Sequence, residues 1–314
     1  QYNKIIVQEP GESSQESAEE FAVTKAAMSS AIFDDPYLAD QWHLINGGNT
    51  SLCKTAVKGA DVSVKDAWRL TAGDPSIIVA VLDGGIMYTH PDLAANIWTN
   101  TAELEGETGK DDDGNGYVDD VHGYNFVTGK PEITWNQKTD SGHATHVAGT
   151  VAAVNNNGLG VCGVAGGSGN GDGVRIMSCQ IFVDKTSSSA AVARAFMYAA
   201  DNGATVAQCS FGYDSGEYKT EDEFRKACSA EYAGIQYFMD KKNCRSDVVD
   251  GNIVVFSAGN NGKPMSSYPG ALKDVISVTA FGPGFQPAGY ANYGTGCNIA
   301  APGGDYYVGR AGYN

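Results

Sequence analysis

The sequence predicts an α/β protein with a doubly wound, mostly parallel sheet in three layers, with helices on both faces of the sheet. Two observations carry this prediction. Segments of helical period alternate with apolar segments, which is the pattern of parallel βαβ units. The apolar segments are rich in β-branched residues, as is typical of strands buried on both faces. They cover residues 76–82, 174–183, 205–211, 252–257 and 274–280.

Composition narrows the class of protein. The chain has 314 residues, is 42% hydrophobic and carries a formal net charge of -16. Binding to phosphates needs clustered Lys and Arg, so this charge argues against a nucleic-acid partner. A membrane-spanning helix needs about 20 consecutive apolar residues. We find no such run and expect no membrane span.

The N-terminal part differs from the rest of the chain. Residues 1–40 are expected to form a leader, either a remnant of a pro-region or an arm on the surface. Within it, Ser17-Ala-Glu-Glu20 has the pattern of a capping box, which predicts a short helix through Met28. No linker rich in Pro, Gly or Ser divides residues 41–314, and we predict that they form one domain.

Three further segments are predicted to be helical. They cover 61–68, 143–154 and 188–202. Gly73 closes the first and Gly203 stops the third, because glycine readily adopts the left-handed conformation that ends a helix.

Residues 213–250 interrupt the alternation of strands and helices. They are rich in charged residues, and we interpret them as a solvated, partly helical insertion, with a rim of the substrate cleft as the alternative. Seven cysteines leave at least one thiol unpaired within the chain. Cys228 and Cys244 flank part of the insertion and are the pair that we predict to form a disulfide.

Polar residues follow two of the predicted strands, and another opens a predicted helix. Asp83 ends the strand at 76–82, and His143 begins the helix at 143–154. A carboxylate at this position is either catalytic or an ion held by backbone amides. Function in open α/β sheets gathers beyond the carboxyl ends of the strands, so Asp83 is well placed for a catalytic role. Asn260 follows the strand at 252–257 and is either an oxyanion donor or an ordinary turn asparagine.

A second histidine lies one helical turn beyond the first. We expect His146 to face the protein interior in a structural role, whereas the small polar residues around His143 favour a catalytic role for that residue.

Four stretches of sequence carry a resemblance to a known family. They are residues 77–85, 141–150, 254–262 and 299–303. Their order and wording resemble the subtilisin-like serine proteases, the subtilase family, from about residue 41 to residue 303. The resemblance implies that Asp83 orients the histidine, that His143 is the general base and that Asn260 donates to the oxyanion.

The same resemblance implies a substrate cleft. Ser210, Phe211 and Gly212 are similar to the strand with which the family pairs its polypeptide substrates. Four further residues resemble the walls of the primary specificity pocket. The family often has a cis peptide bond before the proline among them, and we expect the bond before Pro269 to be cis. These residues are Ala258, Gly259, Ser267 and Pro269.

The nucleophile motif of the family does not occur in these residues. In relatives, the Ala-Pro-Gly motif at 301–303 is followed by a loop and then by Gly-Thr-Ser-Met-Ala, whereas this sequence ends at Asn314. We therefore predict a C-terminally incomplete domain, inactive alone, with the serine on a following segment or a second fragment of the same precursor. The alternative is a pseudoprotease or peptide-binding protein that keeps the cleft without a nucleophile. The first hypothesis implies a secreted or cell-surface protease that undergoes proteolytic processing.

An acidic turn at 111–122 predicts a calcium site. Asp111, Asp113, Asn115 and Asp119 occupy positions one, three, five and nine of a loop that resembles half of an EF-hand. Position twelve is His122 rather than the bidentate glutamate, so the match is incomplete. The alternative is an acidic surface turn without a metal ion.

Overall fold

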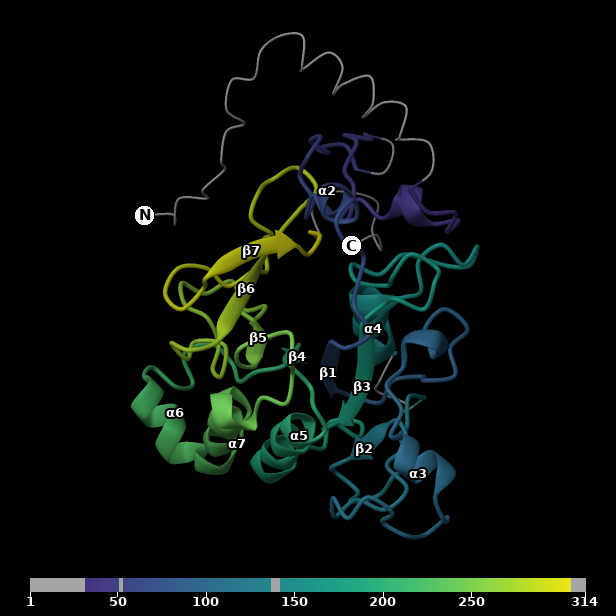
Figure 1. The fold of residues 1–314 in the computed structure, drawn as a ribbon. Coiled ribbons are helices and arrows are strands. Elements are labelled where there is room, and N and C mark those ends of the chain that lie inside the picture. Colours follow the sequence, from purple (N-terminus) through teal and green to yellow (C-terminus); the bar gives the residue numbers. More distant parts are fainter. Residues whose placement is uncertain (1–31, 51–52, 137–141, 306–314) are drawn as a thin grey trace.

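A computed structural model describes residues 32–50, 53–136 and 142–305 of the chain. Within them, seven parallel strands form one sheet with the order β2-β3-β1-β4-β5-β6-β7 (Figure 1). This is the parallel α/β architecture that the sequence predicts. The strands are β1 Ile78–Asp83, β2 Gly123–Asn125, β3 Arg175–Gln180, β4 Val206–Cys209, β5 Ile253–Ser257, β6 Ile276–Phe281 and β7 Ile299–Pro302.

The helices cover the two faces of the sheet unequally. In Figure 1, α5, α6 and α7 lie together on one side, and α4 lies on the other. The α-helices are α2 Val64–Ala67, α3 Thr101–Glu105, α4 His143–Ala152, α5 Ser189–Asp201, α6 Glu221–Ala227 and α7 Ser229–Met239. The short 3-10 helices are η2 Leu38–Asp40, η3 Ala94–Asn96 and η4 Lys241–Asn243.

The sequence predicts the long elements better than the short ones. All five predicted strands and the helices α4 and α5 are present within a few residues of their expected bounds. The predicted helix at 61–68 is reduced to the single turn of α2. The sequence does not predict β2, β7 or α3, because elements of three to five residues carry too little periodicity to stand out. The helix expected in the leader lies outside the described residues.

Two cores sandwich the sheet. The larger packs Ala80 and Leu82 of β1 and Val254 and Phe256 of β5 against α5 and α7. The smaller packs Val79 and other residues of β1 and β3 against the alanines of α4. The alternation of strand residues between the two cores follows from the two-residue period of a strand.

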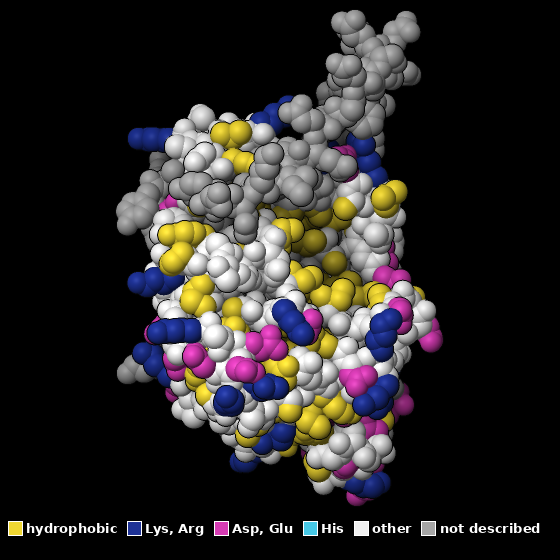
Figure 2. Space-filling view, turned by 90° about the vertical axis from the view of Figure 1, so that its left-hand side faces the viewer, with side chains coloured by type: hydrophobic (Ala, Val, Ile, Leu, Met, Phe, Trp, Pro, Cys, Tyr) yellow, Lys and Arg dark blue, Asp and Glu magenta, His cyan; other side chains and the backbone are white. Residues whose placement is uncertain are grey.

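Within the described residues, the face of the sheet that α4 partly covers is left open over β4–β7. Register places Val206, Val255, Val278 and their neighbours on this face, in line with the first residues of β5, β6 and β7. Those first residues are strongly exposed for strand positions in a parallel sheet: Ile253 is 46%, Ile276 is 40% and Ile299 is 59% exposed. Figure 2, which looks onto the side where β6 and β7 lie, shows hydrophobic side chains gathered in a hollow. We call this face of β4–β7, on which Ile253, Ile276 and Ile299 lie, the open sheet face.

The insertion at 213–250 folds as predicted into helical structure, namely α6, α7 and η4. The predicted disulfide between Cys228 and Cys244 is wrong, because both thiols are free, as are the other five. Cys228 lies directly before α7 and Cys244 lies beyond its end, so that a helix about 16 Å long separates the two in the chain.

Candidate active site

Asp83 and His143 form a hydrogen-bonded pair. The His143 Nδ1 atom lies 2.8 Å from Asp83 Oδ1. The backbone N–H of Gly84 donates to the same oxygen over 2.7 Å. The Asp83 side chain is 8% exposed, whereas that of His143 is 55% exposed. A buried carboxylate at Nδ1 favours the tautomer with the proton on Nδ1, so that Nε2 is the basic nitrogen.

Local structure explains why these two residues meet. Asp83 is the last residue of β1, which is buried along nearly its whole length. The chain then turns through Gly85, where a Cβ atom would lie 2.1 Å from the carbonyl oxygen of Thr134, so that only glycine fits. His143 is the first residue of α4, which packs on β1 through the smaller core. The strand end and the helix start therefore fall at the same edge of the sheet.

The other predicted chemistry-bearing residues follow neighbouring strands at this edge. Ser210 follows β4, and Asn260 lies in the turn after β5. Because β1, β4 and β5 are adjacent and parallel, the three strand ends point to the same edge. Asn260 is exposed and makes no hydrogen bond within the described parts of the chain, so its amide is available to a substrate.

The segment at 210–212 is held on both sides. The Ser210 hydroxyl accepts a 2.7 Å hydrogen bond from Gln208 Nε2. The Phe211 ring lies 5.3 Å from the ring of Phe256, between centroids, in an edge-on arrangement. A Cβ atom on Gly212 would lie 3.1 Å from the carbonyl oxygen of Tyr268, which limits this position to a small residue.

The predicted specificity-pocket residues lie together. The Ser267 N–H donates to the Ala258 carbonyl oxygen over 2.8 Å. Gly259 has a φ of 99°, and a Cβ atom there would lie 2.4 Å from Ser267 Oγ, so glycine is required on both counts. The Tyr268-Pro269 peptide bond is cis, which confirms the prediction.

Sequence reasoning missed Asn292, which stabilises the turn that carries Asn260. Asn292 is fully buried, and its Nδ2 donates to the Ala258 carbonyl oxygen over 2.8 Å. Its Oδ1 accepts from the N–H groups of Asn261 and Lys263, both at 3.0 Å. Asn292 begins the stretch Asn-Tyr-Gly, which is typical of an ordinary turn, so no local pattern predicts this long-range role.

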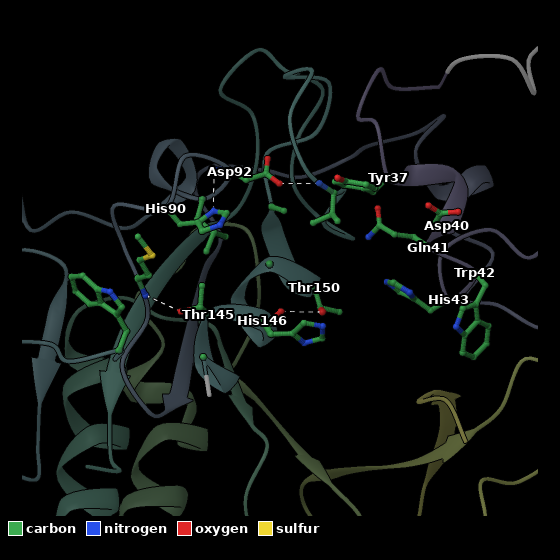
Figure 3. A pocket seen from close by; sticks show the side chains of 17 residues that line it. Tyr37, Asp40, Gln41, Trp42, His43, His90, Asp92, Thr145, His146 and Thr150 are labelled. Atoms are coloured by element: carbon green, nitrogen blue, oxygen red, sulfur yellow. Dashed lines mark hydrogen bonds between the residues drawn. The ribbon is translucent and has the colours of Figure 1, made fainter. Parts of the chain in front are cut away.

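The prediction that His146 faces the interior is wrong. Ala144, Ala148 and Ala152 pack in the smaller core, and a rotation of 100° per residue turns position 146 away from them. His146 is exposed and lines a cavity of about 570 Å³ beside α4 (Figure 3).

This cavity is separate from the Asp83–His143 pair, since neither residue lines it. Its walls come from α4, the loop after β1 and the segment at 37–43 (Figure 3). His43 reaches in from that segment, and burial, together with the charge of His146, lowers its pKa. A neutral imidazole is therefore the dominant form of His43 at neutral pH.

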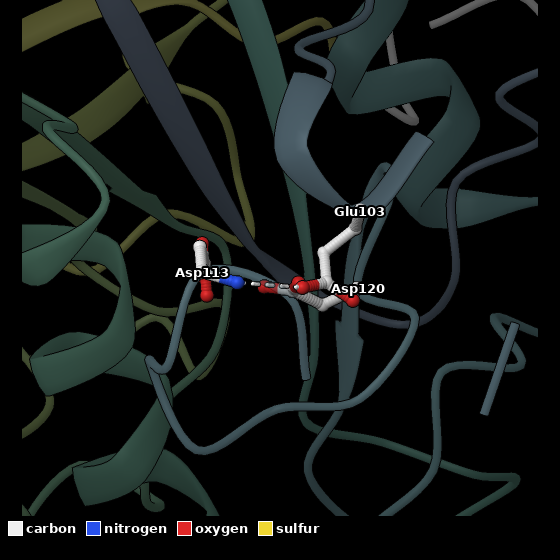
Figure 4. A group of neighbouring side chains, drawn as sticks. All are labelled: Glu103, Asp113 and Asp120. Atoms are coloured by element: carbon white, nitrogen blue, oxygen red, sulfur yellow. Dashed lines mark hydrogen bonds between the residues drawn. The ribbon is translucent and has the colours of Figure 1, made fainter. Parts of the chain in front are cut away.

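Three carboxylates converge at the loop after α3 (Figure 4). Oxygen atoms of Glu103, Asp113 and Asp120 lie within 4.8 Å of one another. Asp120 is fully buried, and burial raises its pKa despite hydrogen bonds from Tyr198 and two asparagines. Among the described residues, none of the three carboxylates pairs with a lysine or arginine.

Of the four residues predicted to bind calcium, Asp113 belongs to this group. Asp111 accepts from the N–H groups of residues 114–116, and Asp119 accepts from Gly109. Asn115 donates to Asp113 Oδ2 over 3.1 Å and to Asp120 Oδ2 over 3.1 Å. The loop is thus closed by its own side chains, and its role as a calcium site stays a prediction.

These features define a class of protein: an α/β fold with a base and its orienting carboxylate at the carboxyl edge of a parallel sheet. The family model described as the subtilase family, Peptidase_S8, matches residues 74–314. The chain belongs to this family. Within the described residues, no helix is both long enough and apolar enough to cross a membrane.

Individual relatives agree with the family. The chain is 30% identical over 241 residues to the "Thermophilic serine proteinase" of Bacillus sp. (strain AK1), a match that covers 76% of this chain and 47% of the relative. It is 27% identical to "Thermitase" of Thermoactinomyces vulgaris, over 77% of this chain and 68% of the relative. A solved protease structure from Pseudoalteromonas arctica PAMC 21717 is similar with a TM-score of 0.56 and 26% identity, over 87% of this chain and 73% of that one.

The matched part is short relative to the first of these proteins. The chain spans about half the length of the Bacillus proteinase, 47% of it.

Proposed function

We propose that this chain is the part of a serine endopeptidase that carries the general base and its orienting carboxylate. In this proposal His143 takes the proton of a serine hydroxyl, Asp83 holds the imidazole and stabilises its charged form, and Asn260 donates to the oxyanion. The 2.8 Å contact between His143 Nδ1 and Asp83 Oδ1 is the observation that carries it.

The proposed substrate is a polypeptide in extended form. It would lie along residues 210–212, with a side chain in the pocket between Ala258, Gly259 and the wall at 267–269. The hydrogen-bonded turn and the close backbone approaches in this region support the proposal, because such contacts keep a cleft open for an added strand. We propose secretion or cell-surface exposure on the family resemblance alone.

The nucleophile serine would come from a following segment or a second fragment of the same precursor. The open sheet face supports this part of the proposal, because strands in the middle of parallel sheets are normally covered on both faces. Each large apolar side chain that such a segment buries would contribute roughly 1.5–3 kcal/mol. This chain alone would then lack activity.

Covalent labelling with a fluorophosphonate tests this proposal, since the reagent reacts with a serine that a neighbouring base activates. A labelled serine outside the 314 residues supports a completed protease. A pseudoprotease or peptide-binding protein would remain unlabelled while folded.

We also propose that calcium binds at the acidic turn. The ligands would be Asp113 together with either Asp111, Asn115 and Asp119 or the buried Glu103 and Asp120. The donor set fits, because calcium is a hard cation that prefers several carboxylate oxygens, and these three oxygens converge without a basic partner among the described residues. Bound calcium would offset the repulsion between the carboxylates and fix the loop at 111–120.

Calcium is expected to raise the melting temperature by several degrees, since a ligand at 100 times its Kd stabilises by about 2.7 kcal/mol. Scanning calorimetry with calcium and with a chelator measures the shift. Asp113→Asn should abolish it, and the exposed Asp66→Asn should leave it intact. Loss of the shift in Asp120→Asn but not in Asp111→Asn would select the buried ligand set. An unchanged melting temperature in chelator would contradict calcium binding.

A further inference from the structure

A buried carboxylic acid lies behind the proposed substrate cleft. Glu231 is in the first turn of α7 and is 1% exposed. The Tyr213 hydroxyl donates to Glu231 Oε2 over 3.0 Å. Its other oxygen, Oε1, is buried without a hydrogen-bond partner among the described residues. A full negative charge here would be poorly solvated.

The environment of Glu231 favours its neutral form. Burial is the largest influence and raises its pKa to about 7, against the opposing effects of the Tyr213 and Ser189 hydroxyls. The dipole at the beginning of a helix also favours the negatively charged form, but its effect on the pKa is small compared with that of full burial. Glu231 therefore changes charge near neutral pH, unlike an exposed glutamate.

In the part of the chain that the structure describes, the groups around Glu231 supply no compensating cation. The segment after β4 contributes the Tyr213 hydroxyl, and the end of β4 contributes the thiol of Cys209. The Cys228 thiol, between α6 and α7, donates to the Tyr213 oxygen over 3.3 Å. The arginine of α5, Arg194, donates instead to the carbonyl oxygen of residue 126.

The other elements near Glu231 also supply no positive charge to its carboxylate within the described residues. The strand β5 has no ionisable side chain. The charged side chains of α6 and η4 are exposed or half-buried, and several pair with each other or with nearby aspartates.

Tyr213 connects this acid to the proposed specificity pocket. Its backbone N–H donates to the Tyr268 carbonyl oxygen over 2.9 Å, which joins the segment at 210–213 to the wall at 266–270. The Tyr268 ring stacks on Phe224 of α6 at 5.4 Å with an interplanar angle of 16°. Phe224 also contacts the Tyr213 ring, at 6.0 Å between centroids. Packed side chains thus connect Glu231 of α7 and Phe224 of α6 to both sides of the pocket.

We propose that Glu231 is a positioning residue whose state of protonation sets how Tyr213, and through it the substrate-pairing segment, lies against the wall of the specificity pocket. Ionised Glu231 accepts a stronger hydrogen bond from the Tyr213 hydroxyl and draws this side chain toward α7, which loosens the contact between the Tyr213 N–H and the Tyr268 carbonyl oxygen. Substrate binding therefore weakens as the pH rises through neutrality. The assignment of this region as a specificity pocket depends on the proposed function, whereas the link between Glu231 and Tyr213 does not.

The sign of the pH effect follows from the direction of the shift. The folded state raises the pKa of Glu231 from 4.5 to about 7. The stability that comes from this group is fully present below about pH 4.5 and is lost as the pH rises through about 7. An ordinary salt-bridged glutamate has the opposite dependence.

Nuclear magnetic resonance on the folded protein tests the proposal without any protease activity. The Glu231 side-chain carboxyl carbon is expected to titrate with a midpoint near 7, and the amide resonances of Tyr213 and Tyr268 should titrate with the same midpoint. A Glu231 midpoint near the ordinary value of 4.5 would overturn the proposal. Tyr213 and Tyr268 amides that do not follow the Glu231 titration would overturn it as well.

Variants give the matched comparison. Glu231→Gln keeps an acceptor for Tyr213 and cannot ionise, so both amide titrations should vanish. Glu221→Gln is the control, because Glu221 also accepts from a tyrosine, Tyr232, but is only half-buried. In a serine-containing preparation, KM should rise with pH across the midpoint while kcat does not follow, and KM of Glu231→Gln should stay flat. Amide titrations that persist in Glu231→Gln would overturn the proposal, whereas an inactive preparation with intact titrations would count only against the proposed protease function.

Discussion

Asp83→Asn in a serine-containing preparation is expected to lower kcat by about 10⁴-fold at neutral pH, the scale known for this change in serine protease triads. An asparagine can offer its amide N–H to His143 Nδ1, which would place the imidazole proton on Nε2 and remove the base. It also cannot stabilise the imidazolium that forms during acyl transfer. Steady-state kinetics on a peptide substrate measure the loss, and KM should change little because the pair does not line the pocket.

The control for this variant is Asp66→Asn. Asp66 is exposed and pairs with Arg69 at 3.5 Å, so its loss removes a carboxylate without touching the proposed site. We expect unchanged kcat, because exposed ion pairs contribute less than about 1 kcal/mol. If Asp83→Asn retained full activity with a native melting temperature, Asp83 would not be the orienting carboxylate.

Two neighbouring residues of β5 are expected to respond very differently to the same substitution. Val254 is 1% exposed in the larger core, whereas Ile253 is 46% exposed on the open sheet face. Val254→Asp should cost more than about 4 kcal/mol, because it buries an unpaired charge. This is a large part of a typical total stability of about 5–15 kcal/mol. Ile253→Asp should change the stability of the 314-residue chain by about 1 kcal/mol at most.

The same two substitutions, Val254→Asp and Ile253→Asp, distinguish the 314-residue chain alone from a protein that also contains the serine segment. If a further segment covers the open sheet face, Ile253→Asp should lower the stability of a serine-containing preparation by about 2 kcal/mol or more, since a buried apolar side chain is then lost. Denaturant unfolding of both preparations, followed by circular dichroism, makes the comparison. An equally small effect of Ile253→Asp in both would show that no segment covers this face.

The sequence predicts the larger architecture because strand and helix periods are strong over long segments. The run of apolar residues before Asp83 and the small residues after His143 each have one plausible structure, and the resulting strand end and helix start bring the two side chains together. The 2.8 Å contact between them is therefore anticipated by local patterns together with the family resemblance.

Other features depend on contacts that no local pattern contains. Asn292 stabilises the Asn260 turn from a loop that is distant in sequence, and it does so through a buried amide with four hydrogen-bond partners. Glu231 reads as one charge in a charged insertion, and its burial appears only when α7 packs on α5 and the Tyr213 segment. The error on His146 has a similar origin, since the direction of a helix face depends on which side meets the sheet.

The exposure of β5 and β6 also could not be predicted. Their β-branched runs are typical of strands covered on both faces, and the sequence carries that expectation correctly for β1 and β3. For β5 and β6 the covering layer is absent from the described residues on one face. Burial therefore alternates with period two along β5, and β6 is half-buried over its last four residues.

Fluorophosphonate labelling of the protein as isolated from the organism that makes it tests the central claim most directly. Peptide mapping by mass spectrometry then locates the modified residue, with heat-unfolded protein as the control. We predict one labelled serine, on a polypeptide or segment outside these 314 residues, and no labelling in His143→Ala. A folded protein that stays unlabelled, or a label on a serine within these residues, would contradict the account.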